Sequence, residues 1–251
     1  MRIIARLDIK NSNLIKSINL EGLRVIGDPN TFAKKYYKDG ADELIFMDLV
    51  ASLYNRNSLH DIIKKVSNNI FIPITVGGGI RSIDDALKIF DSGADKIAIN
   101  TAAIKNPSLI NFLAKRFGSQ AVVVSIEAKR KINDWEVYIE SGREQTNLSV
   151  KNWVKEATDQ GCGEILLTSI DQEGTGKGFD TELLSTITKN TSVPVIASGG
   201  FGDLKDVKAG FIDSKADAIA VADAIHYDKI NLRQIRKKGL DLGLNLRDFN
   251  Q

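Results

Sequence analysis

The chain contains 251 residues, of which 43% are hydrophobic and 26% are charged, with a formal net charge of +2. These values are typical of a soluble globular protein with a sizeable core, and the length suits one large α/β barrel. The lysines and arginines are scattered and only two histidines are present, which argues against nucleic-acid binding, histidine metal sites and Ser-His-Asp triads.

Three features of the sequence predict a cytoplasmic protein. Cys162 is the only cysteine, so no intramolecular disulfide can form and a reducing compartment is expected. The first residues, MRIIARLDIK, reach Asp8 after an apolar run that is too short for a signal peptide. No later stretch is long and apolar enough to cross a membrane, so we expect no membrane contact.

Eight short apolar runs alternate with amphipathic segments along the whole chain. Continuous rather than alternating hydrophobicity is typical of strands covered on both faces, as in a parallel sheet. The segments between the runs have helical periodicity, and several end in glycine, as helices often do. Eight such units without a break in composition predict one domain, residues 1–251, folded as a closed α/β (β/α)8 TIM barrel. The predicted strands are residues 2–8, 43–49, 72–76, 96–100, 121–127, 164–170, 193–198 and 217–222.

The two halves of the chain repeat each other. IPITVGGGI (72–80) resembles VPVIASGGF (193–201), which lies 121 positions later. GADKIAIN (93–100) resembles KADAIAVA (215–222) at nearly the same offset, 122 positions. A repeat of this length indicates two equivalent half-barrels, so functional positions are expected in pairs.

Asp8 at the end of the first predicted strand and Glu127 at the end of the fifth form such a pair. Active sites of these barrels lie at the C-terminal ends of the strands, and strands one and five are on opposite sides of an eight-stranded barrel. Two carboxyl groups that face each other across the mouth can divide general-acid and general-base work. Either acid alone could equally well cap a loop, but the symmetric pair favours catalysis.

A glycine cluster follows the third predicted strand in TVGGGIR (75–81) and the seventh in ASGGFGD (197–203). Glycine lets the backbone approach an anion closely, and free N–H groups at a helix start bind phosphate. One such cluster is most often only a tight turn, whereas two at symmetric positions indicate two anion sites. Asn100 and Thr101 would complete the first site, but Asp223 after the eighth strand would repel a phosphate at the second.

Two insertions are candidates for lids over the barrel mouth. Residues 9–27, with Lys16, form a long connection between the first strand and the helix that opens after Asp28. Long loops at the top of barrels commonly cover the substrate and exclude water. Residues 131–147 hold a candidate hairpin, for which a substrate role and simple decoration are equally good interpretations.

Four charged residues begin predicted strands at the opposite face of the barrel: Arg2, Glu43, Lys96 and Glu164. Charges at the bottom of a barrel usually only contact water, and this interpretation is the stronger one for each residue alone. Their alternating signs near the axis could instead form a salt-bridge ring that closes the lower entrance.

The chain resembles the HisF family, the cyclase subunits of imidazole glycerol phosphate synthase, in the motifs LDIK, GADEL, TVGGGI, GADKIAINTAA, GEILLTSID and PVIASGG. The likeness runs nearly end to end. It implies a barrel that forms a heterodimer with a glutaminase (HisH-like) subunit and needs no cofactor or metal. Ammonia from the partner would pass up the barrel to a bis-phosphorylated ribulosyl intermediate, giving imidazole glycerol phosphate and an aminoimidazole carboxamide ribotide.

The resemblance also implies roles for residues of this chain. Asp8 and Glu127 stand at the two catalytic positions, and Lys16 stands at the loop lysine beside the substrate. The other substrate and phosphate positions are Gly79, Asn100, Thr101, Thr168, Glu173, Ser198, Gly199, Gly200, Ala222 and Asp223. The charged gate through which ammonia enters is matched by Arg2, Glu43, Lys96 and Glu164.

Three acidic residues depart from the family pattern, since Glu127 and Glu173 replace a usual aspartate and Asp223 replaces a usual serine. An extra methylene shifts a carboxylate by about an ångström, which can cost roughly 10²-fold in rate. These departures favour a paralogous branch associated with glycosyl amidation, in which ammonia converts an acetamido sugar of a surface polysaccharide to an acetamidino sugar. The segments that resemble this branch are EGLR (21–24), FMDLVASLY (46–54) and SIEAKR (125–130).

Two other functions remain open at this point. The chain could be the cyclase of histidine biosynthesis, with Glu127 in place of the aspartate. It could also be a non-catalytic subunit that docks the glutaminase and conducts ammonia to another enzyme.

Overall fold

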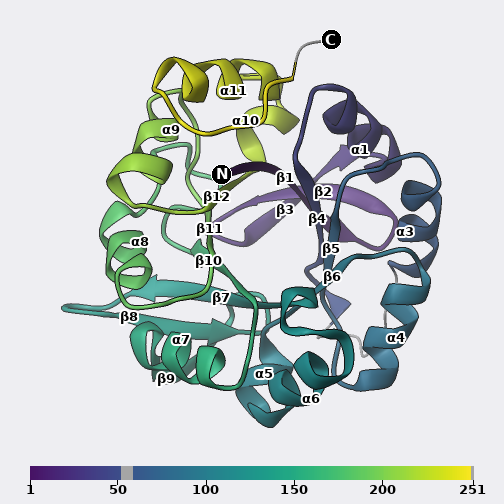
Figure 1. Cartoon of the computed structure of the whole chain (residues 1–251), viewed down its shortest axis with the longest axis vertical. Coiled ribbons are helices and arrows are strands. Elements are labelled where there is room, and N and C mark those ends of the chain that lie inside the picture. The colour runs from purple at the N-terminus through teal and green to yellow at the C-terminus, as the bar shows by residue number, and fades with distance from the viewer. Residues whose placement is uncertain (52–58, 250–251) are drawn as a thin grey trace.

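A computed structural model describes residues 1–51 and 59–249, so the end of the 46–54 segment lies outside the described part. The barrel strands are β1 (Arg2–Lys10), β4 (Glu43–Asp48), β5 (Ile74–Gly77), β6 (Lys96–Ile99), β7 (Val122–Arg130), β10 (Glu164–Ser169), β11 (Val195–Ser198) and β12 (Ala218–Val221). These eight strands pair in parallel in the order β10-β11-β12-β1-β4-β5-β6-β7, and the pairing of β10 with β7 closes the barrel. Helices surround it (Figure 1). The predicted (β/α)8 barrel is confirmed.

Proline decides where two of the barrel strands begin. The two predicted strands that contain a proline start two residues too early, since β5 begins at Ile74 and β11 at Val195. Pro73 and Pro194 have no N–H to donate to the ladder, although the carbonyl of each accepts from the strand before it.

Four of the described helices begin at a residue whose side chain caps them: Asp28, Ser82, Asp180 and Asn231. Asp28 accepts from the backbone N–H of Thr31 at 2.8 Å, and Pro29 takes the first helical position, where an N–H has no partner anyway. Asn231 forms a capping box with Gln234. The helices are α1 (Pro29–Lys38), α3 (His60–Ser67), α4 (Ile83–Asp91), α5 (Thr101–Lys105), α6 (Ser108–Phe117), α7 (Val150–Asp159), α8 (Thr181–Thr188), α9 (Asp206–Lys208), α10 (Asp223–His226) and α11 (Leu232–Asp241), with a 3-10 turn at Ser119–Ala121 and a π turn at Ala209–Asp213.

The strands are apolar on both faces because both faces are buried. One core lies between the strands and the helices, and a second, smaller core fills the inside of the barrel. The second core consists of Ile4, Ile15, Ile45, Met47, Leu49, Ala98, Val123, Leu166, Ile196, Ala218 and Ala220. Side chains alternate along a strand, so Arg2, Ile4, Arg6 and Asp8 of β1 all share the inward face. The interior is therefore layered from charged to apolar to polar.

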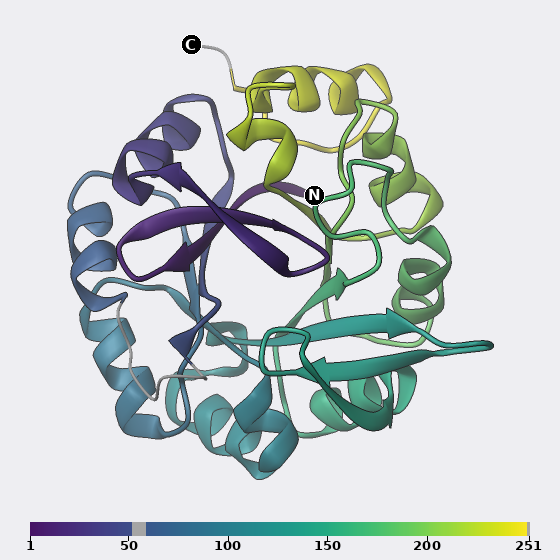
Figure 2. The same cartoon turned by 180° about the vertical axis from the view of Figure 1, so that it is seen from behind.

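Two antiparallel hairpins extend the barrel at one end. The first consists of β2 (Asn13–Ile18) and β3 (Glu21–Gly27) and follows β1, and the second consists of β8 (Trp135–Ile139) and β9 (Glu144–Ser149) and follows β7. Both hairpins lie in front of the barrel in Figure 2. The hairpin predicted within 131–147 is confirmed, and one hairpin in each half matches the sequence repeat.

The expectation of a long loop over residues 9–27 was wrong. β1 continues to Lys10, and the rest of the insertion is the β2–β3 hairpin, with Leu14 and Ile15 fully buried. Leu20 at its tip packs against Tyr138 and Ile170 on the other side of the mouth. The burial of these apolar side chains explains why the segment forms strands that cover the barrel.

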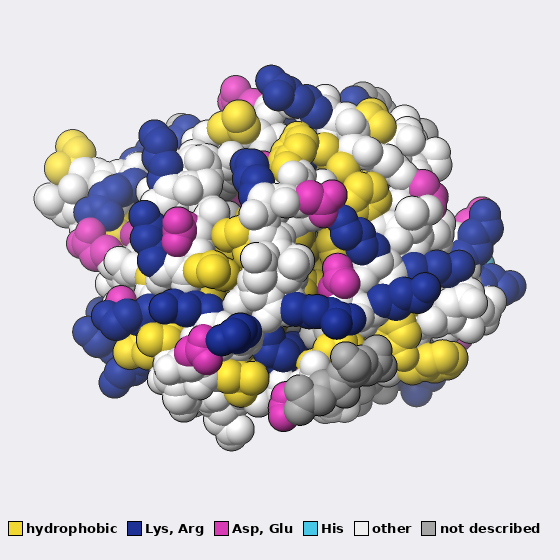
Figure 3. Space-filling model, turned by 90° about the horizontal axis from the view of Figure 1, so that it is seen from above, with side chains coloured by type: hydrophobic (Ala, Val, Ile, Leu, Met, Phe, Trp, Pro, Cys, Tyr) yellow, Lys and Arg dark blue, Asp and Glu magenta, His cyan; other side chains and the backbone are white. Residues whose placement is uncertain are grey.

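The outer surface carries mixed charge. On the face drawn in Figure 3, lysines and arginines are interspersed with acidic residues and small apolar patches. Within residues 1–51 and 59–249, no helix combines the length and apolar character that a membrane span needs. The same ranges contain no group of three His, Cys, Asp or Glu residues placed to hold a metal ion.

Candidate active site

The two predicted catalytic acids lie inside the same end of the barrel. Asp8 is on β1 and Glu127 on β7, and four strand-to-strand steps separate these strands in either direction around the barrel. Their exposed fractions are 1% and 5%. The structure therefore places the two acids inside the same mouth, as the repeat predicted. Asp8 is near enough for its negative charge to raise the pKa of Glu127.

The environment of Glu127 suits proton transfer near neutral pH. Burial raises the pKa of Glu127 to about 7, and the charge of Asp8 acts in the same direction. The guanidinium of Arg6 and the backbone N–H of Gly142 oppose this rise. A carboxyl group with this pKa is present in both protonation states at neutral pH, so it can donate and accept protons.

A cavity of about 310 Å³ opens beside Glu127, and it contains the first predicted phosphate site. The predicted residues Gly79, Asn100 and Thr101 line it, together with Gly78. Gly78 has a φ of +100°, and a Cβ there would clash with the carbonyl of Asp48, so the turn requires glycine. Gly79 also has a positive φ, of +73°.

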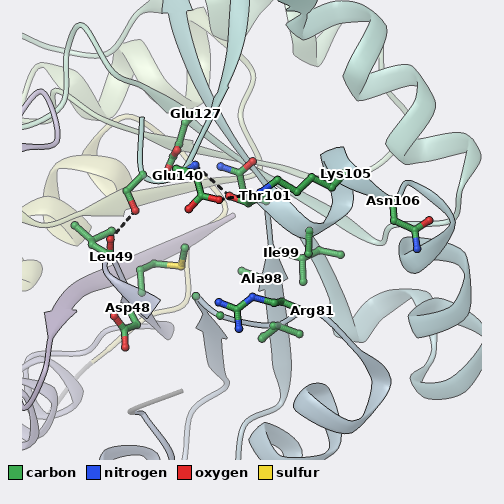
Figure 4. A pocket seen from close by; sticks show the side chains of 17 residues that line it. Asp48, Leu49, Arg81, Ala98, Ile99, Thr101, Lys105, Asn106, Glu127 and Glu140 are labelled. Atoms are coloured by element: carbon green, nitrogen blue, oxygen red, sulfur yellow. Dashed lines mark hydrogen bonds and ion pairs between the residues drawn. The ribbon is translucent and has the colours of Figure 1, made fainter. Parts of the chain in front are cut away.

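Sequence reasoning missed the cations of this cavity. Arg81 and Lys105 line it, and Figure 4 shows Glu127 and Glu140 on one side of it and Arg81 on the other. Lys105 pairs with Glu140 at 3.1 Å, and an Arg81 amino group donates to the carbonyl of Ala51 at 3.0 Å. The position of Arg81 two residues after the last glycine of the cluster was the signal in the sequence. These cations suit the cavity to an anion.

The second hairpin forms a wall of this cavity. Glu140 and Ser141, at the turn after β8, line it. The N–H of Glu140 donates to the hydroxyl of Thr101 at 3.1 Å, and the amide of Asn100 donates to the carbonyl of Tyr138 at 3.3 Å. The hairpin is thus part of the candidate site and not simple decoration.

The second predicted anion site is a narrow cleft of about 10 Å³ across the mouth. It is lined by Arg6, Lys16, Glu173, Gly174, Ser198, Gly199, Gly200, Phe201, Ala220, Ala222 and Asp223. Lys16 of the β2–β3 hairpin forms a buried ion pair with Glu173 in the loop after β10. A Cβ at Gly200 would clash with the carbonyl of Gly178, so close backbone approach explains this glycine without a phosphate.

Asp223 is less repulsive than the sequence suggested. Lys229 pairs with it at 2.6 Å, and the side chain of Asp223 is 12% exposed. The lysine offsets part of the carboxylate charge that an incoming phosphate would meet.

We expect Asp223→Ser to lower the KM for a bis-phosphorylated substrate by about tenfold, because it removes an anion and frees Lys229. Lys229→Met should act in the opposite direction and raise KM, since it leaves the carboxylate unpaired. Steady-state kinetics on both variants checks the prediction, and an unchanged KM in both would show that no phosphate binds near Asp223.

Arg6 is a residue of the site that sequence reasoning missed. Its guanidinium is buried, lines the second cleft, and donates to Asp8, Thr168 and Ser198. Thr168 and Ser198 are direct neighbours in the pairing of β10 with β11, and Thr168 also pairs with Glu127. The predicted polar positions therefore lie side by side next to the catalytic acids.

The four charges at the lower end form a closed ring of ion pairs. Arg2 pairs with Glu43 at 2.7 Å and with Glu164, and Lys96 pairs with Glu43 at 3.1 Å and with Glu164 at 3.0 Å. The glutamates are buried, whereas the side chains of Arg2 and Lys96 are 25% and 18% exposed. The ring lies below the apolar core of the barrel, at the end opposite to Asp8.

Comparisons with known proteins agree with this geometry. Residues 2–231 match the model of a family described as "Histidine biosynthesis protein". A relative from Legionella pneumophila, named imidazole glycerol phosphate synthase subunit HisF, is 61% identical over 207 residues, which are 82% of this chain and 98% of the relative. Proteins of the same name from Wolinella succinogenes and Alkaliphilus metalliredigens are 45% and 42% identical and cover 97% and 98% of this chain and 98% of each relative.

These names contradict the glycosyl-amidation branch that the sequence favoured. The prediction of sugar amidation was wrong, and the histidine-biosynthesis alternative is better supported. The structure supplies a physical reason, because the substitutions behind the prediction preserve charge balance. Glu173 pairs with Lys16, Asp223 pairs with Lys229, and Glu127 still places a carboxyl group inside the mouth.

Proposed function

Because the chain belongs to the histidine biosynthesis protein family, as a HisF member, we propose that it is the cyclase subunit of imidazole glycerol phosphate synthase. In this role it is a lyase-type enzyme within a glutamine amidotransferase complex, and it acts with a glutaminase subunit. The observation that carries the proposal is the pair of buried acids, Asp8 and Glu127, above an apolar barrel interior and a closed ring of charges.

The two acids are suited to opposite proton transfers. Ammonia adds to the carbonyl carbon of the ribulosyl group, one proton passes from its nitrogen to the oxygen to give a carbinolamine, and the resulting hydroxyl then leaves as water. Glu127, with a pKa of about 7, donates the proton that the departing oxygen needs. Asp8, paired with Arg6, accepts a proton from the nitrogen. With the proton already transferred in the addition, the oxygen gains two protons and the nitrogen loses two. Closure of the ring then breaks the bond to the ribotide, and the proton left on the attacking nitrogen passes to the amino group of the departing ribotide.

The two anion sites would hold the two phosphates of the substrate. Gly79, Asn100 and Thr101 bind the first, with Arg81 and Lys105 as counter-charges. The second is bordered by Ser198, Gly199, Gly200, Ala222 and Asp223, and Lys16 of the β2–β3 hairpin lies beside it as a cation. A phosphate that enters the narrow second cleft would compete with Glu173 for Lys16, since the two side chains form an ion pair there.

We expect kcat at a fixed concentration of free ammonia to fall as the pH rises through about 7, because Glu127 donates a proton and loses it above its pKa. The measurement is a pH profile with added ammonium, corrected for the free base. Glu127→Gln should remove this inflection together with most of the activity. A profile that keeps the same inflection in Glu127→Gln would assign it to another group.

The test of the function is a direct assay of the purified chain with the ribulosyl intermediate and an ammonium salt. Formation of imidazole glycerol phosphate and the ribotide supports the proposal, and growth of a strain that lacks the histidine cyclase supports it independently. Absence of both would refute it. Glu127→Gln addresses the ammonia-conducting alternative, because unchanged pathway output in this variant would show that the chain does not catalyse the step.

A further inference from the structure

Arg6 is an unusual residue for the inside of a strand barrel. It is 2% exposed and stands between Ile4 of the inner apolar core and Asp8 on the inward face of β1. Long charged side chains are almost never fully buried without partners. The neighbouring residues of β1 do not explain why an arginine is buried here, so the explanation must lie in the groups that Arg6 contacts.

The partners of Arg6 come from three different strands. Its Nε donates to Oδ1 of Asp8 at 2.8 Å. One amino group donates to the hydroxyls of Thr168 on β10 at 2.9 Å and Ser198 on β11 at 3.0 Å. A guanidinium is planar and rigid, so these three bonds fix Asp8 relative to the two hydroxyls.

The other charged groups around Arg6 keep it ionised. Burial works against its charge, but Asp8, Glu173 and Glu127 together raise its pKa above the ordinary value. Lys16 of β2 lies in the same cluster and is held by Glu173. His226 of α10 stays neutral, since burial and then Lys16 lower its pKa to about 3. Arg6 and Lys16 thus balance Asp8 and Glu173.

We propose that Arg6 is a positioning residue, which holds the carboxylate of Asp8 and the hydroxyls of Thr168 and Ser198 in the one arrangement that the reaction uses. Arg6 acts through Asp8, and the inference rests on the proposed cyclase reaction for the role of that acid. Lysine cannot replace it, because a single ammonium lacks the planar fork that bonds three groups in fixed directions. A displaced carboxylate would slow the chemical step and leave substrate binding nearly unchanged.

The first experiment compares Arg6→Lys and Arg6→Gln with a matched control. Arg236 is also buried, at 4% exposed, and pairs with Asp42 at 2.8 Å, but it lies on α11 outside the barrel. We expect Arg6→Lys to lower kcat about 10²-fold with a smaller rise in KM, since Arg6 also lines the second cleft, and Arg236→Lys to lower only the melting temperature. If both substitutions lower the melting temperature and neither changes kcat, Arg6 is merely structural and the proposal fails.

The second experiment needs no substrate. Carboxyl carbon NMR of the free protein follows the titration of Glu127 in wild type, Arg6→Lys and Arg6→Gln. Arg6 holds the pKa of Glu127 down, so Arg6→Gln should move its midpoint above about 7, whereas Arg6→Lys should keep it near the wild-type value. The carboxyl shift of Asp8 should change in both variants, since both lose the fixed bond from Nε. Unchanged Asp8 and Glu127 signals overturn the proposal.

The two experiments separate this inference from the proposed function. A wild-type chain that gives no product refutes the cyclase reaction, and the NMR titration still decides whether Arg6 positions Asp8. An active wild type with unimpaired Arg6 variants refutes the role of Arg6 alone.

Discussion

Replacing Asp8 with asparagine is expected to lower kcat about 10³-fold, because general acid–base groups typically contribute 10²–10⁴-fold to the rate. The side chain keeps its size and can still accept the bond from Arg6, so the loss comes from the missing proton acceptor. KM should change by less than about threefold, since Asp8 lines neither anion cleft. Ammonia-dependent steady-state kinetics measures both parameters without a partner subunit.

The same substitution also removes the anion that pairs with buried Arg6. Breaking a fully buried pair costs roughly 3–5 kcal/mol, so the melting temperature should fall and rates should be measured well below it. Asp159→Asn is the control, because Asp159 forms only an exposed pair with Lys155 on α7. A kcat within tenfold of wild type in Asp8→Asn would remove Asp8 from the mechanism.

The barrel could be predicted because its signals are local. A parallel strand covered on both faces is a continuous apolar run, and each of the eight runs corresponds to an observed barrel strand. The ends of the strands were harder to predict. β5 and β11 begin one residue after Pro73 and Pro194, because a proline has no N–H to donate to the sheet. The β2–β3 hairpin was missed because its burial depends on distant residues such as Tyr138.

The candidate site was only partly predictable, for the same reason. Asp8 and Glu127 could be paired through the internal repeat, because equivalent positions of two half-barrels fall on opposite strands of the closed barrel. Arg6 gave no such signal, because its partners Thr168 and Ser198 are 162 and 192 positions away. Short motifs also led to the wrong prediction of the glycosyl-amidation branch, because the replacement of one acid by another does not determine which substrate is bound.

Lys96→Met is expected to uncouple glutamine hydrolysis from product formation in the complex with the glutaminase. The ring at the lower end loses both ion pairs of Lys96, so Glu43 and Glu164 keep only Arg2 as a partner. On the proposal that ammonia enters the barrel through this ring, the loss of the two pairs lets water and ammonia exchange with solvent there. The ratio of product to glutamine consumed should fall well below one-to-one, while the rate with added ammonium stays within about twofold, because the acids above the apolar core are untouched.

The comparison of the two nitrogen sources makes this prediction specific to the ring. The stability cost should be smaller than the roughly 3–5 kcal/mol of a fully buried pair, because the Lys96 side chain is 18% exposed. Lys155→Met, which removes an exposed pair on α7, controls for the loss of a lysine. If Lys96→Met lowers both rates equally, the ring only stabilises the fold. If the ratio stays one-to-one, ammonia does not enter past Lys96, because loss of the ion pairs on its path would let part of the ammonia escape to solvent.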